Sequence, residues 1–112
     1  MGAAVIVNDA TFKEQVLKSE LPVMVDFFAD WCGPCVRMAP VVEEAANDYQ
    51  GKVKICKLNV SESNTTATEY SIMSIPTFMF FKNGQVVDQT VGAMSKDQLR
   101  ARLDALLAGE KK

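Results

Sequence analysis

The segment from Pro22 to Ala29 restricts the possible folds more than any other part of the chain, because it is almost continuously apolar. A strand of this composition is buried on both faces, as in sheets that helices cover on both sides. One carboxylate, Asp26, interrupts the run. The segment therefore predicts a central strand between two helical layers, with one acid enclosed among apolar side chains.

Strand and helix patterns alternate along the rest of the chain. A helix after Cys35 is indicated by apolar residues at helical spacing, at Met38, Val41, Val42, Ala45, Ala46 and Tyr49. A short helix with Phe12, Val16 and Leu17 on one face precedes the central strand. Further strands are expected at residues 3–7, 53–59, 77–81 and 85–91, and a further helix at residues 64–70.

Two local signals define the C-terminal part. Asn83-Gly84 is typical of a tight hairpin between two strands. Ser95, with Gln98 three residues later, forms a capping box that predicts the start of a last helix. The resulting order, β-α-β-α-β-α-β-β-α, predicts an α/β fold with a mixed five-stranded sheet flanked by four helices.

Length and charge narrow the class of protein. A chain of 112 residues fits one domain, taken as residues 1–112. The net charge of -2 comes from 12 basic and 14 acidic residues that are spread along the chain, which argues against a nucleic-acid surface. The longest apolar run, residues 21–25, is too short to span a membrane, and no signal peptide is apparent. A soluble intracellular protein is expected.

The most informative motif is Cys32-Gly33-Pro34-Cys35, between the central strand and the long helix. This position places Cys32 at the helix start, where free N–H groups and the helix dipole favour its thiolate. Cys35 follows about one turn later, close enough to attack a mixed disulfide at Cys32. Pro34 suits the first helical turn, and Gly33 leaves room for a partner's backbone.

A Cys-x-x-Cys motif can also belong to a zinc site or to a structural disulfide. Structural zinc needs four Cys or His ligands, whereas the chain has one further cysteine, Cys56, and no histidine. A purely structural disulfide is possible but unusual in an intracellular protein. Cys56 itself is expected to be a small core residue. The α/β context favours a redox role for Cys32 and Cys35.

The motif and three later segments together resemble the thioredoxin family. The first block is Trp-Cys-Gly-Pro-Cys at residues 31–35, preceded by Val-Asp-Phe-Phe-Ala. Ser-Ile-Pro-Thr, Phe-Phe-Lys-Asn-Gly and Val-Gly-Ala follow in the family's order, at residues 74–77, 80–84 and 91–93. The chain differs at residue 28, where many relatives have tryptophan, and at Val36, where a basic residue is common and here Arg37 comes next.

The resemblance implies roles for the residues around the motif. Cys32 would attack the disulfide of a client protein and Cys35 would resolve the mixed disulfide. Asp26 would accept the Cys35 proton, with Lys57 as its charged neighbour. Burial among apolar residues also predicts a raised pKa for Asp26. A hydrogen-bonded structural aspartate and an ordinary strand-end lysine are the alternatives.

The resemblance also implies a shallow docking groove for an extended client chain. Its lining would be the cis-proline turn Ile75-Pro76 together with Gly33, Pro34, Gly92 and Ala93. Trp31 would flank the groove, unless it is a core tryptophan.

The function implied is reduction of protein disulfides. The partners would be a thioredoxin reductase, as electron donor, and client proteins with disulfides. The protein would be a cytoplasmic monomer that needs no cofactor or metal. A disulfide oxidant or isomerase is less consistent with Gly33-Pro34, since such relatives usually carry a histidine there. A non-catalytic binding module that uses only the groove is the third possibility.

Overall fold

The computed structural model describes residues 3–109 and contains one sheet with helices on both faces. Its order is β1 (Val5–Val7), η1 (Lys13–Leu17), β2 (Val23–Phe28), α1 (Gly33–Asp48), β3 (Lys54–Asn59), α2 (Asn64–Glu69), β4 (Thr77–Lys82), β5 (Gln85–Val91) and α3 (Lys96–Leu107). The sheet order is β1-β3-β2-β4-β5. β3 pairs in parallel with β1 and β2, while β4 is antiparallel to β2 and β5 is antiparallel to β4. The predicted α/β fold with a mixed five-stranded sheet is confirmed.

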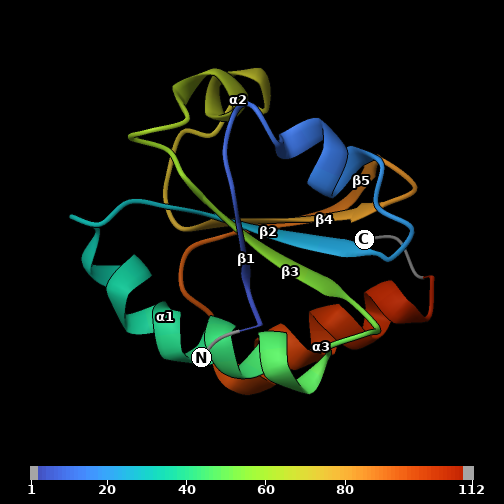
Figure 1. The fold of residues 1–112 in the computed structure, drawn as a ribbon. Helices are drawn as coiled ribbons and strands as arrows, with labels where there is room; N and C mark the ends of the chain where they lie inside the picture. The colour runs from blue at the N-terminus through green and yellow to red at the C-terminus, as the bar shows by residue number, and fades with distance from the viewer. Residues whose placement is uncertain (1–2, 110–112) are drawn as a thin grey trace.

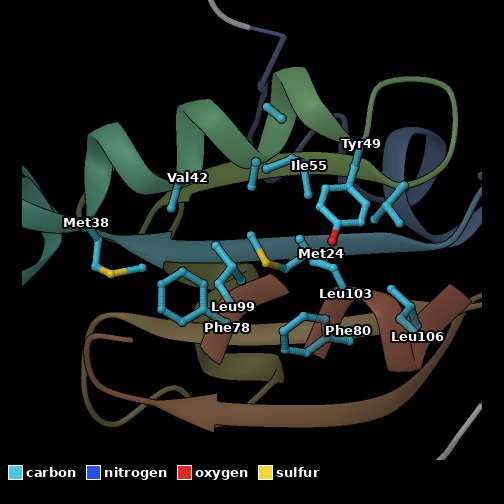
Figure 2. Packing of buried hydrophobic residues seen from close by; sticks show 13 residues of the cluster. Met24, Met38, Val42, Tyr49, Ile55, Phe78, Phe80, Leu99, Leu103 and Leu106 are labelled. Atoms are coloured by element: carbon cyan, nitrogen blue, oxygen red, sulfur yellow. The ribbon is translucent and has the colours of Figure 1, made fainter. Parts of the chain in front are cut away.

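The helices divide between the two faces of the sheet (Figure 1). α1 and α3 lie on one side, and η1 and α2 lie on the other. Alternate residues of β2 point to opposite faces, so Met24 joins the core under α1 and α3, whereas Val25 joins the core under η1 and α2. Figure 2 shows how side chains of α1, α3 and the central strands interdigitate in the first of these cores.

The first helix differs from its prediction. It is a five-residue π-helix, η1, in which the N–H of Lys18 bonds to the carbonyl of Lys13 at 3.0 Å. Its apolar side of Phe12, Val16 and Leu17 nevertheless packs against the sheet as the spacing indicated. The strand predicted at residues 3–7 forms only at Val5–Val7.

Both C-terminal signals are confirmed. Asn83 and Gly84 adopt φ values of 53° and 79° between the paired residues Lys82 and Gln85, which gives a two-residue turn. At α3 the Ser95 hydroxyl accepts the N–H of Gln98, and the Gln98 side chain accepts the N–H of Ser95. No helix within residues 3–109 is long and apolar enough to cross a membrane.

Candidate active site

The two motif cysteines lie where the central strand passes into the first long helix. β2 ends at Phe28, and α1 begins at Gly33 with Cys32 as its N-cap residue. The Sγ atom of Cys32 accepts the backbone N–H of Cys35 at 3.2 Å. The sequence therefore placed Cys32 correctly, at a helix end that favours negative charge on its sulfur. The structure shows the pair oxidised as a disulfide, with Cα atoms 5.2 Å apart.

The pair is more enclosed than the sequence suggested. Cys32 is 5% exposed and Cys35 is 6% exposed. The sulfur of Cys32 lies 3.8 Å from the Ile75 carbonyl oxygen, and Ala29 packs against both cysteines. The loop before β4 therefore covers part of the disulfide, a contact between segments 43 residues apart in the sequence.

The cis-proline turn and the glycine turn after β5 meet beside the disulfide. The Ile75-Pro76 peptide bond is cis. The N–H of Gly92 donates to the Pro76 carbonyl at 2.8 Å, and Gly92 has a φ of 96°, which a side chain would rarely permit. Gly33 and Ala93, like Pro34, are exposed. The structure thus joins the Ile75-Pro76 turn both to Cys32 and to Gly92.

Trp31 is a surface residue rather than part of the core. It is 74% exposed, and its indole N–H donates to the Ser61 hydroxyl at 3.2 Å. Ser61 in turn is held by its own N–H, which donates to the Asn59 side chain at 2.9 Å. Sequence reasoning did not find Ser61, because no motif connects it with a tryptophan 30 residues away.

Asp26 is the acid that the sequence predicted to be enclosed. It is 2% exposed, and its Oδ1 atom has no hydrogen-bond partner among the residues that the structure describes. Burial raises the pKa of this carboxyl to about 7, although the positive charge of Lys57 lowers it in part. No protein group within residues 3–109 therefore satisfies this oxygen.

Lys57 lies opposite Asp26 on the neighbouring strand β3, in the middle of that strand rather than at its end. Its ammonium group is 4.7 Å from the centre of the Phe28 ring. A cleft of about 160 Å³ is lined by Phe28, Cys35 and Lys57, among others. Alternation along β2 places the Asp26 side chain on the same face as Phe28, which is the face that α1 covers.

The third cysteine belongs to the core, as expected. Cys56 is fully buried in β3 and packs with the apolar residues under η1 and α2. Burial raises the pKa of its thiol to about 12. A thiol in this state is a poor nucleophile near neutral pH.

A mixed sheet that presents a Cys-Gly-Pro-Cys disulfide at a helix N-terminus, beside a cis-proline turn, defines a thiol-disulfide oxidoreductase. The family model described as Thioredoxin matches residues 3–105. The chain belongs to the thioredoxin family.

Curated relatives support the same assignment. A thioredoxin of Synechocystis sp. is 56% identical, over 96% of this chain and 100% of its own length. A thioredoxin of Pseudomonas aeruginosa is 54% identical, over 88% of this chain and 92% of its own length. A chloroplastic M-type thioredoxin of Pisum sativum is 50% identical, over 88% of this chain and 58% of its own length. The protein is a protein-disulfide reductase that works by dithiol-disulfide exchange through Cys32 and Cys35.

Proposed function

We propose that Cys32 is the attacking cysteine and Cys35 the resolving cysteine. The Cys32 thiolate attacks one sulfur of a client disulfide, which forms a mixed disulfide and releases the first client thiolate. The Cys35 thiolate then attacks Sγ of Cys32, which closes the Cys32–Cys35 disulfide and releases the second client thiolate. Two electrons pass to the client. The N-cap position of Cys32, with its sulfur bonded to the Cys35 N–H, is the observation that carries this assignment.

The proton released by Cys35 is assigned to Asp26. A group with a pKa of about 7 exchanges protons readily at neutral pH. The cleft that borders Cys35 and Lys57 lies on the α1 face of β2, the face to which Asp26 also belongs, and its volume of about 160 Å³ can hold water next to Cys35 and Lys57. Lys57 assists by stabilising the carboxylate once the proton has left.

Client proteins dock, in this proposal, across the turns beside the disulfide. An extended client strand would lie over Ile75 and Pro76 and would contact surrounding residues, namely Trp31, Gly33, Pro34, Gly92 and Ala93. This docking site is supported by the exposure of four of these residues at one end of the sheet, near the partly covered sulfur of Cys32. The four are Trp31, Gly33, Pro34 and Ala93. Extended peptides commonly bind through their backbone at such sites.

The remaining proposals concern the setting of the reaction. A thioredoxin reductase is proposed to return the pair to the dithiol form after each cycle. The protein is proposed to act in the cytoplasm as a monomer, with residues 1–112 as a single domain. Relatives of nearly the same length from bacteria support this setting.

Reduction of insulin, coupled to NADPH through a bacterial thioredoxin reductase, tests the assignment. Cys32→Ser should abolish activity, whereas Cys35→Ser should accumulate a mixed disulfide at Cys32 that mass spectrometry can map. Cys56→Ala is the matched control and should keep its activity. A mixed disulfide mapped to Cys35, or full activity in Cys32→Ser, would contradict the proposed roles.

A redox titration against glutathione separates a reductase from an oxidant or isomerase. A pair that becomes reduced only under strongly reducing conditions fits the reductase, with a potential near the thioredoxin value of about −270 mV. A pair that glutathione reduces readily would instead indicate an oxidant.

A further inference from the structure

A second cleft lies between the end of β5 and α3, beside the proposed docking groove, with which it shares Ala93. Its volume is about 370 Å³. Val91 and Ala93 line one wall, and Gln98, Ala101 and Arg102 line the other. The lining mixes small apolar groups with an amide and a guanidinium, a combination suited to a peptide segment, which carries both apolar side chains and polar backbone groups.

The cleft begins where the proposed docking groove ends. Val91 and Ala93 flank Gly92, which is bonded to Pro76 beside the disulfide. Met94, another residue of the cleft, has its N–H 3.3 Å from the sulfur of Met38. Met38 follows Cys35 by three residues on α1, which is about one helical turn. The cleft therefore lies at the same end of the molecule as the reactive pair.

The wall formed by β5 is an open sheet edge. β5 is an edge strand of the sheet, and the N–H of Gly92, the residue that follows β5, points inward and donates to the carbonyl of Pro76, the residue that precedes β4. Because antiparallel pairs alternate, the N–H and C=O of Val91 point outward, away from β4. Gln89 also points outward, but its N–H is taken by the Asp88 carboxylate at 2.8 Å. The backbone groups of Val91 thus lie beside the cleft at the open edge of the sheet.

Arg102 holds this arrangement in place from α3. Its Nη1 atom donates to both carboxylate oxygens of Asp88 at 2.8 Å, and Asp88 is almost buried. The guanidinium carries further N–H donors on Nη2 and Nε, which suit peptide carbonyls. This ion pair ties β5, at Asp88, to α3, at Arg102, and so holds the two walls of the cleft together.

We propose that this cleft binds an extended segment of the client polypeptide that flanks the client's disulfide. The client backbone pairs with Val91, and one of its side chains lies between Ala93 and Ala101. The inference rests on the proposed docking groove, with which the cleft is continuous, and that continuity points to a client segment as the occupant. Clients with an extended chain beside the disulfide are then reduced more efficiently than short ones.

Two disulfide peptides test this inference, a short one that ends close to its disulfide and a long one extended by about six residues, the length of an average strand. Ala101→Phe fills the cleft, and Ala108→Phe, at the exposed end of α3, is the matched control. The native protein should reduce the long peptide about fivefold more efficiently in kcat/KM, as one added hydrogen bond allows. Ala101→Phe should lose this preference, whereas Ala108→Phe should keep it.

Equal kcat/KM for both peptides in the native protein, or an unchanged length preference in Ala101→Phe, overturns the inference. Ala101→Met fills part of the same cleft with a flexible side chain and decides the matter if Ala101→Phe does not fold. A length preference retained in Ala101→Met likewise overturns the inference. If the native protein reduces neither peptide, the result counts against the proposed roles of Cys32 and Cys35 in client reduction. That outcome is distinct from failure of the cleft inference, in which both peptides are reduced but without a length preference.

Discussion

At the scale of single residues, Asp26 shows how the fold sets the chemistry of a side chain. The carboxyl is enclosed on a central strand, and burial disfavours its charged form. Its charged neighbour Lys57 compensates only in part, so the pKa remains near 7. When Asp26 ionises, its buried charge destabilises the folded protein. The ionisation of the proposed proton acceptor is therefore linked to the stability of the fold.

The stability of the protein should fall as the pH rises between about 4 and 7 because of Asp26. The folded carboxyl titrates at about 7 and the unfolded one near its ordinary 3.8, so the folded state binds more protons in this window. The loss is on the order of 4 kcal/mol. Asp26→Asn should remove most of this dependence and stabilise the protein at neutral pH, which guanidinium unfolding at several pH values can measure.

The exposed Asp97 provides the control for this experiment. Asp97→Asn should keep the slope of the native protein. If Asp26→Asn and the native protein lose stability equally from pH 5 to 7, the buried carboxyl does not titrate as proposed.

Cys56 should be unreactive in the oxidised native protein. It is the free thiol of that form, fully buried, and its pKa is raised to about 12. Iodoacetamide at pH 8 should therefore add no label to the native protein and one label after unfolding in guanidinium, as read by mass spectrometry. Rapid labelling under native conditions would show that β3 opens and that the thiol is available for regulation.

At the scale of elements, the sequence predicted what depends on nearby residues. The capping box of α3 and the Asn83-Gly84 turn each need only a few consecutive residues, and both formed as predicted. The helix start at Cys32 also follows from a local pattern. The covering of Cys32 by Ile75 and the bond from Trp31 to Ser61 depend on how distant segments pack, so no local pattern contains them.

Gly84 shows how a local signal and a distant contact combine at one position. Its φ of 79° disfavours any side chain, and an added Cβ would lie 2.9 Å from the Leu17 carbonyl oxygen of η1. Gly51 has a similar φ of 84° but has open space around it. The hairpin turn therefore both reverses the chain and packs against the first helix.

Gly84→Ala should accordingly destabilise the protein more than Gly51→Ala. We expect a loss of about 1 kcal/mol at Gly51 from backbone strain alone, and roughly 2–3 kcal/mol at Gly84, where the clash with backbone adds to it. Guanidinium unfolding midpoints at constant slope give both values. Equal losses for the two variants would show that the turn moves away from η1 at little cost.

At the scale of the whole molecule, one sheet separates two apolar cores and the reactive pair sits at its end. β2 contributes to both cores, since Met24 and Val25 are fully buried on opposite faces. The same strand leads directly into the active-site turn at Cys32. The position of the cysteines therefore depends on both layers, although each core packs against different helices (Figure 1).

This shared strand predicts that the two cores unfold together. Met24→Ala and Val25→Ala remove neighbouring side chains from opposite cores, and each should destabilise the protein by about 2–4 kcal/mol. Far-UV circular dichroism reports on the sheet and helices, while the fluorescence of Trp31, the one tryptophan, reports on the active-site end. The two signals should give the same midpoint in each variant, because losing either core removes the support of β2. If the fluorescence midpoint lies below the circular-dichroism midpoint in only one of the two variants, the active-site end depends on a single core.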